Sequence, residues 1–283
     1  MRILLTGKDG QLGGALQKGL APLGELLALG RPELDLANTS ALSAALRSFK
    51  PDLIVNAAAY TAVDRAESEA ELAQAINARA PGILAEEARR LGSRLIHYST
   101  DYVFDGRKNA PYVEEDPTAP LNVYGHSKLA GEAAIAASGC RHFILRTSWV
   151  YGARGQNFLL SMLRLGRERP QLRVVNDQIG APTWCESLAR MTLEMLGQEV
   201  DTGLYHATDS GHTSWHGFAA EIFRLAKIAT PLQAIPSEDY PTPAQRPRNS
   251  RLDNSKRLRA TGGTQRPWNE SLAECLRELG IDT

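Results

Sequence analysis

Short apolar runs alternate with longer helical patterns along the first half of the chain, and this alternation restricts the fold more than any other feature. The runs are apolar on both faces, which is typical of parallel strands that helices cover on both sides. The expected strands are 1–6, 25–29, 53–59, 94–99 and 143–147, and the main helices between them are 38–49, 69–91 and 122–138. We therefore predict an α/β fold with a Rossmann-type doubly wound parallel sheet.

The pattern becomes less regular after Trp149. Further helices are expected at 157–167, 183–196, 214–226 and 267–279, and short strands at 172–175 and 204–207. The segment 233–251 is rich in proline and arginine, and we expect it to cover a cleft. We predict that residues 1–150 form the dinucleotide-binding domain and that 151–283 form mainly a smaller α/β substrate-binding part, with some chain crossing back.

Composition excludes several classes of protein. The 32 basic residues balance the 32 acidic ones, which argues against a nucleic-acid or membrane-surface partner. Cys140, Cys185 and Cys275 are too scattered for a disulfide framework and lack a C-x-x-C spacing, so we expect buried thiols. The apolar run at the N-terminus stops at Gly7, which is too short for a signal peptide or a membrane span. A cytoplasmic enzyme with a small-molecule substrate fits these features.

Three glycines follow the first expected strand and open a helix that carries Leu12, Leu16 and Leu20. Their spacing is G-x-x-G-x-x-G. It suits a tight turn, close approach of the backbone to a pyrophosphate, and a helix N-terminus whose free N–H groups attract phosphates. A glycine-rich turn without a ligand would have the same composition, but its position between strand and helix favours a nucleotide site. The residues expected there are Gly7, Gly10, Gln11, Leu12 and Gly13.

The second strand ends at Gly30-Arg31, where NAD-binding folds place an acidic residue on the adenine ribose. Arg31 is the first polar side chain here, and an arginine can pair with the 2′-phosphate of NADPH. A solvated loop residue explains Arg31 almost equally well. The expected cofactor is therefore NADPH, with NADH tolerated.

Tyr124 and Lys128 lie four residues apart and share one face of an expected helix. An ammonium beside a phenol favours the phenolate, so we expect Lys128 to lower the pKa of Tyr124 from its usual value of about 10. Seen alone, Y-x-x-x-K is more often a solvated helix face than a catalytic pair. Thr100 ends the preceding apolar run, and its hydroxyl can hydrogen-bond the oxygen of a ketone that Tyr124 protonates. Lys128 is also expected to hold the ribose of the cofactor.

These motifs together resemble the extended short-chain dehydrogenase/reductase superfamily, and more finely the dTDP-4-dehydrorhamnose reductase family. The resemblance extends over nearly the whole chain. The stretches that carry it are Leu5–Gly13, Asn56–Glu67, Ser99–Gly106, Tyr124–Lys128, Leu145–Gly152, Asp177–Thr183 and Arg246–Leu252.

The resemblance implies reduction of dTDP-4-dehydro-β-L-rhamnose to dTDP-β-L-rhamnose with NADPH or NADH. The residues that it places at the cofactor, besides the glycine loop, Tyr124 and Lys128, are Asp35, Leu36, Ala57, Ala59, Tyr60, Thr61 and Tyr98. The residues that it places at the sugar nucleotide are Val63, Thr100, Asp101, Trp149 and Arg246. For Arg246 the role is to bind the diphosphate, and a solvated arginine-rich loop is the alternative.

Two positions depart from the family pattern. Tyr60 stands where the family usually has His. Mg²⁺ links dimers in some members through an acidic residue early in the first helix, where this chain has Ala15, so no metal site is expected and the protein is expected to be a monomer or homodimer. His206, His212 and His216 lack the neighbouring cysteines or fixed helical spacing of a metal site.

Two alternatives remain open. The first is an epimerase or dehydratase of nucleotide sugars with tightly bound NAD. Dehydratases have Thr-Asp-Glu where this chain has Thr100-Asp101-Tyr102, and the missing acid argues against that activity. The second is a non-catalytic regulatory subunit that binds nucleotide, which the intact Thr100, Tyr124 and Lys128 disfavour.

Overall fold

Six strands form the central sheet of the computed structural model, which describes residues 1–283. They are β1 (Arg2–Thr6), β2 (Glu25–Leu29), β3 (Leu53–Asn56), β4 (Arg94–Thr100), β5 (Arg141–Thr147) and β10 (Gly203–His206). All pair in parallel, in the order β10-β5-β4-β3-β1-β2. After β2 the chain crosses back to β3 on the other side of β1, so the strand order reverses between β1 and β3. Ligands of open α/β sheets bind at such a point, beyond the carboxyl ends of the strands.

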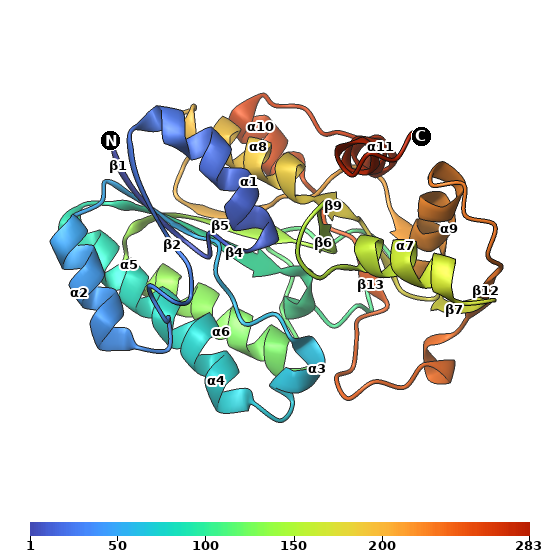
Figure 1. Ribbon diagram of the computed structural model, residues 1–283. Helices are drawn as coiled ribbons and strands as arrows, with labels where there is room; N and C mark the ends of the chain where they lie inside the picture. The colour runs from blue at the N-terminus through green and yellow to red at the C-terminus, as the bar shows by residue number, and fades with distance from the viewer.

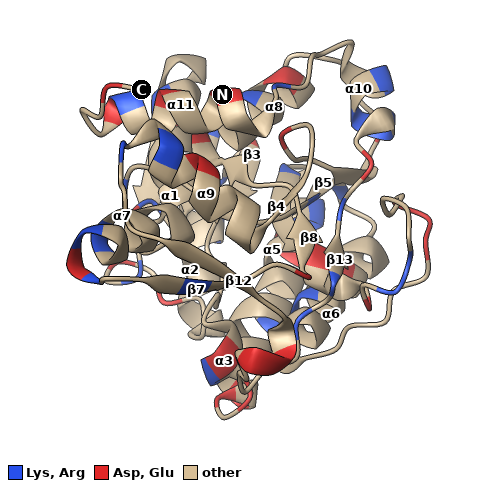
Figure 2. Ribbon diagram, turned by 90° about the vertical axis from the view of Figure 1, so that its right-hand side faces the viewer, with Lys and Arg blue, Asp and Glu red and all other residues tan.

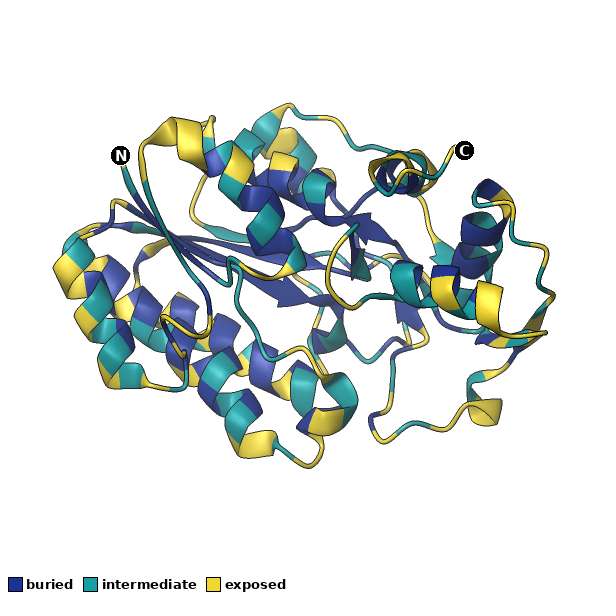
Figure 3. Ribbon diagram, viewed as in Figure 1, coloured by how far each residue is buried: buried dark blue, intermediate teal, exposed yellow.

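Helices cover both faces of this sheet (Figure 1), which confirms the predicted doubly wound fold. On one face lie α1 (Gln11–Leu20) and α8 (Cys185–Leu196), and on the other α2 (Thr39–Phe49), α5 (Ala80–Leu91) and α6 (Val123–Ser138). The strand residues that face each layer belong to two separate apolar cores. Figure 3 shows the inner strands β1, β3, β4 and β5 almost entirely buried, whereas the edge strand β2 is only partly buried. The helices are buried mainly on the side facing the sheet.

The second half of the chain builds a smaller α/β part at one end of the sheet (Figure 1). There β7 (Leu172–Val175) pairs in parallel with β12 (Leu232–Ile235), and α7 (Phe158–Glu168) packs against α9 (Trp215–Leu225). Three short strands, β11 (Thr213–Ser214), β8 (Ile179–Gly180) and β13 (Asn249–Ser250), form a second small sheet. The remaining elements are β6 (Val150–Tyr151), β9 (Thr183–Trp184), α10 (Ser255–Thr261) and α11 (Trp268–Glu278). The chain returns to the central sheet through β10 and α8, which packs on α1.

Most of the expected elements are present, but the structure departs from the prediction at several places. The strand expected at 53–59 ends at Asn56, and the short helices α3 (Val63–Ala66) and α10 were not predicted. The helix expected at 69–91 is divided into α4 (Ala70–Gln74), a π-helical turn (Ala75–Arg79) and α5. In that turn Asn77 bonds the backbone of Tyr60 and the hydroxyl of Ser127, and its carbonyl oxygen lies 2.1 Å from where a Cβ on Gly131 would be. The segment 233–251 is more regular than expected, since most of β12 and all of β13 lie within it.

Surface charges of both signs are interspersed, and α7 and α11 each carry acidic and basic residues (Figure 2). The three cysteines are free and buried, as predicted. None of the helices combines the length and apolar character needed to cross a membrane.

The glycine loop between β1 and α1 is held by contacts that leave no room for side chains. Gly7 has φ of +76°, donates to the carbonyl of Leu29 at 2.9 Å, and accepts from Gly10 N at 3.0 Å. A Cβ on Gly13 would lie 1.9 Å from the Gly7 carbonyl oxygen. The N-cap Gly10 offers no side chain to the first N–H groups of α1, so these groups remain available to an anion.

The two adjacent helical glycines provide a matched test of this packing. Gly13→Ala forces the loop away from α1 and is expected to cost more than about 2 kcal/mol of unfolding free energy. Gly14→Ala places its Cβ 4.0 Å from the nearest atom, so it is expected to be neutral or to stabilise by up to about 1 kcal/mol. Urea unfolding measures both. Equal effects of the two substitutions would contradict this packing.

Candidate active site

The predicted catalytic residues come together where β4 ends beneath the start of α6. Thr100 is the last residue of β4, and Tyr124 lies in the first turn of α6. Asn122 caps this helix by accepting from Gly125 N at 2.8 Å, which fixes the helix start. The Thr100 hydroxyl donates to Asp101 at 3.1 Å and accepts from Tyr102 N at 3.2 Å, so it is held in place as well.

The prediction that Lys128 lowers the pKa of Tyr124 is wrong for this structure. Burial raises the pKa of Tyr124 to about 12, and the Thr100 hydroxyl opposes part of that rise. The Lys128 side chain is instead directed at β4, where Nζ donates to the Tyr98 carbonyl oxygen at 2.6 Å. A tyrosine with a raised pKa is fully protonated at neutral pH, and this is the form that a proton donor needs.

Lys128 itself is buried, and burial lowers its pKa to about 8 although Glu132 opposes the shift. The Lys128 Nζ also lies 3.1 Å from Nε2 of His97, which precedes Tyr98 on β4. His97 Nδ1 contacts Asn56 Nδ2 at 2.9 Å, and Asn56 Oδ1 accepts from the Thr6 hydroxyl at 2.7 Å. The sequence analysis did not single out His97, and it included Thr6 and Asn56 only as parts of motif stretches, without a role. The available signal was a set of polar residues inside strands that are otherwise apolar.

A second buried polar group braces the same region. Arg146 on β5 binds Glu132 on α6 through Nε at 2.9 Å and Nη2 at 2.6 Å, and the Ser99 hydroxyl donates to the same carboxylate. This two-point ion pair between Arg146 and Glu132 fixes α6 against β4 and β5, one helical turn beyond Lys128.

Asp101 lies beside the Thr100 hydroxyl and is buried, with one carboxylate oxygen lacking a partner. Burial raises its pKa to about 7, and hydrogen bonds from Ser250 and Thr100 limit the rise. The carboxyl is therefore poised to change its charge near neutral pH.

At the end of β2 the structure adds an acidic residue that the sequence analysis did not consider. Glu33 accepts from Gly30 N at 2.9 Å and pairs with Lys8 of the glycine loop at 2.5 Å. Arg31 is exposed beside this pair. Farther along, Asp35 accepts from Ala37 N at 3.0 Å, and Leu36 is buried.

The loop after β3 brings its small residues against the glycine loop. A Cβ on Gly7 would lie 2.9 Å from the Ala57 carbonyl carbon, while Ala59 is half-buried and Thr61 exposed. Tyr60 is clamped by Asn77 through its backbone and donates its hydroxyl to Glu69 at 2.6 Å. The Tyr98 phenol is turned to the α8 side of the sheet, where it bonds Thr192 at 2.8 Å, so its backbone carbonyl is the part directed at Lys128.

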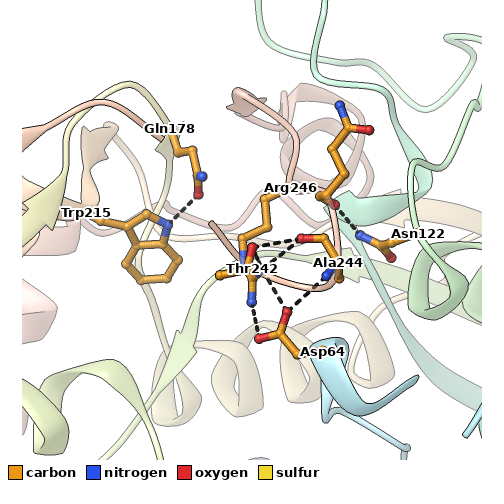
Figure 4. Close-up of polar contacts among 8 residues, drawn as sticks. Asp64, Asn122, Gln178, Trp215, Thr242, Ala244 and Arg246 are labelled. Carbon is orange, nitrogen blue, oxygen red and sulfur yellow. Dashed lines mark hydrogen bonds and ion pairs between the residues drawn. The ribbon is translucent and has the colours of Figure 1, made fainter. Parts of the chain in front are cut away.

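Trp149 follows β5 in a left-handed conformation with φ of 49°. Its ring stacks on Trp215 with centroids 3.6 Å apart, and a Cβ on Gly180 would lie 2.5 Å from it. Trp215 Nε1 donates to Gln178 Oε1 at 3.2 Å (Figure 4). A platform of two aromatic rings therefore stands at the start of the second part of the chain.

Arg246 is held by Asp64, the residue after Val63 in the short helix α3 (Val63–Ala66). The guanidinium contacts both carboxylate oxygens, at 3.0 and 2.7 Å, and also the Thr242 hydroxyl and Ala244 carbonyl (Figure 4). Asn122, the cap of α6, donates to the Gln245 carbonyl at 2.7 Å. The segment around Arg246 is thereby fixed to the two elements that carry Val63 and Tyr124.

Comparison with known proteins agrees with this geometry. The family model described as the RmlD substrate binding domain matches residues 1–281. The dTDP-4-dehydrorhamnose reductases of Burkholderia thailandensis and Escherichia coli K12 are each 46% identical to this chain, and the matches cover at least 99% of this chain and 99% of each relative. The chain belongs to the dTDP-4-dehydrorhamnose reductase family. The resemblance drawn from its motifs is therefore confirmed.

Solved structures support the same family. A dTDP-4-dehydrorhamnose reductase from Clostridium acetobutylicum superposes with a TM-score of 0.95 at 40% identity, covering 99% of this chain and 100% of that one. One from Bacillus anthracis, solved in complex with NADP, gives 0.93 at 38% identity, covering 98% and 99%. The UDP-glucose 4-epimerase of Thermus thermophilus, in complex with NAD, gives 0.85 at 19% identity over 99% of both chains, a likeness that shows the fold alone.

The raised pKa of Asp101 predicts a specific pH dependence of stability. Because its folded pKa of about 7 exceeds the unfolded value of about 3.9, the native state loses stability as pH rises through this interval. Asp101→Asn removes that titration. The variant is expected to gain about 2 to 4 kcal/mol relative to wild type between pH 4 and pH 7. Urea unfolding at several pH values measures this, and a difference independent of pH would contradict the assignment.

Proposed function

We propose that this protein reduces the C4 keto group of dTDP-4-dehydro-β-L-rhamnose to give dTDP-β-L-rhamnose, with NADPH or NADH, in dTDP-rhamnose biosynthesis. The observation that carries the proposal is the position of Tyr124, in the first turn of α6, with Thr100 at the carboxyl end of β4. Membership of the reductase family supports the identity of the sugar nucleotide.

The glycine loop fits a dinucleotide, because a side chain on Gly7 or Gly13 would collide with backbone and the uncapped start of α1 can accept phosphates. We assign the pyrophosphate to Gly10, Gln11 and Leu12, and the adenine side to Asp35 and Leu36. The nicotinamide supplies the hydride when bound. Lys8 and Arg31 are the cations available to a 2′-phosphate, and Glu33 is the carboxylate available to a ribose hydroxyl.

Tyr124 acts as the general acid in this proposal. Its phenol is neutral at pH 7 and gives its proton to the C4 oxygen as the ketone becomes an alcohol. The Thr100 hydroxyl hydrogen-bonds the same oxygen and stabilises the charge that develops on it. Lys128 holds the cofactor ribose and supplies positive charge one helical turn from Tyr124.

The second part of the chain is assigned to the sugar nucleotide. Trp149 is assigned to the sugar through its aromatic face, Asp101 and Val63 are assigned to the same sugar nucleotide, and Arg246 is the cation assigned to the diphosphate. The Asp64 carboxylate already binds the Arg246 guanidinium. A diphosphate must therefore share the guanidinium with this carboxylate or displace it. We propose residues 1–150 as the cofactor part and 151–283 as mainly the substrate part of a cytoplasmic monomer or homodimer, without nucleic-acid or membrane partners and without a bound metal.

Tyr124→Phe tests the acid directly. The variant is expected to lose at least about 100-fold in kcat, because the proton donor is removed, and to bind NADPH as wild type does. The assay follows the loss of NADPH absorbance with enzymatically prepared dTDP-4-dehydro-L-rhamnose.

Tyr151→Phe is the matched control. The Tyr151 hydroxyl is buried without a hydrogen-bond partner, so its removal is expected to leave turnover unchanged. No turnover by wild type, or undiminished turnover by Tyr124→Phe, would overturn the proposed function.

A further inference from the structure

Four buried polar side chains form a continuous row beneath the candidate active site. Thr6 on β1, Asn56 on β3 and His97 on β4 are direct partners in the register of the parallel sheet, and Lys128 reaches them from α6. Each is at most 2% exposed. The successive contacts measure 2.7, 2.9 and 3.1 Å, so every neighbour is within hydrogen-bond distance.

The hydrogens of this row constrain one another. In the arrangement described above, Asn56 Nδ2 donates to His97 Nδ1, so a neutral His97 carries its proton on Nε2. That N–H faces Lys128 Nζ, and it can donate only to an amine. An ammonium at Lys128 would place two donors against each other.

Turning the Asn56 amide over by 180° gives the opposite arrangement without moving any other heavy atom. His97 then carries its proton on Nδ1 and donates it to Asn56 Oδ1, and the Asn56 amide donates to the Thr6 hydroxyl. His97 Nε2 becomes an acceptor for an ammonium at Lys128. In both arrangements Lys128 also donates to the Tyr98 carbonyl.

We propose that His97, oriented by Asn56 and Thr6, is a positioning residue that accepts from Lys128 as an ammonium and donates to Lys128 as an amine. The row thus has two proton arrangements that match the two charge states of the lysine. Since Lys128 is assigned to the cofactor ribose, its charge state changes how that ribose is held during the reaction. This catalytic consequence depends on the proposed function, whereas the two arrangements do not.

The surroundings leave Lys128 as the group that titrates. Burial and the nearby lysine hold the pKa of His97 well below its usual range, so the imidazole stays neutral. Burial lowers the pKa of Lys128 to about 8. The other titratable groups on this side of the sheet are Glu132, one turn farther along α6 and paired with Arg146 of β5, and Tyr124. The Tyr98 phenol lies on the opposite side, against Thr192 of α8.

Nuclear magnetic resonance of protein labelled with ¹⁵N in the histidine rings tests the row without any turnover. The ¹⁵N shifts distinguish protonated from unprotonated ring nitrogens, and the His97→Gln variant identifies the His97 signals. Near pH 6 we expect the proton on Nδ1, and near pH 10 on Nε2, because the ammonium has become an amine. In Lys128→Met the change with pH is expected to disappear. One tautomer throughout, an imidazolium, or a change that persists in Lys128→Met would overturn the proposal.

A pH profile of kcat separates positioning from a structural role. The amide of His97→Gln reaches Lys128 and can present either an oxygen or an N–H, so the profile is expected to remain that of wild type. The shorter side chain of His97→Asn keeps the contact with Asn56 but does not reach Lys128 Nζ. Loss of the acceptor for the ammonium is expected to lower the pKa of the lysine-dependent limb by about one unit. Equal profiles for the two variants, with both folded by circular dichroism, would contradict the positioning role.

Discussion

The bond from Lys128 Nζ to the Tyr98 carbonyl is the contact on which the candidate site depends. A lysine that is 1% exposed must have hydrogen-bond partners, because an unpaired amine or ammonium in the interior costs several kcal/mol. The partners available to it lie on β4. Meeting this requirement fixes α6 on the sheet, and Tyr124, one turn earlier, is thereby set above the end of the strand that carries Thr100.

Close packing around two glycines determines the geometry of the cofactor side. Gly7 and Gly13 permit α1 to pack directly on the loop that it follows, and the residues after β3 close against that loop. Contacts between distant segments join the two parts of the chain. Asp64 and Arg246, 182 residues apart, tie the second part of the chain to α3, and Asn122 ties it to the start of α6. The geometry of the site therefore depends on both parts of the chain.

Local pattern predicted the parallel sheet, the glycine loop, and Thr100, Tyr124 and Lys128, because apolar period and residue spacing carry that information. The contacts among Thr6, Asn56 and His97 were not predicted, because they follow from strand register, which one sequence does not reveal. The predicted lowering of the pKa of Tyr124 was wrong, because burial raises this pKa and the sequence spacing to Lys128 does not report burial. Glu33 lies only two residues beyond Arg31, but its role at Gly30 depends on how the loop folds back.

Transfer of an isotope tests the central claim most directly, because it reports which atom of the substrate is reduced. The protein would be incubated with dTDP-4-dehydro-L-rhamnose and NADPH carrying deuterium at both positions of nicotinamide C4, and the product examined by nuclear magnetic resonance. We expect dTDP-L-rhamnose with one deuterium, at C4 of the sugar. Deuterium at another carbon, or unlabelled product, would contradict it.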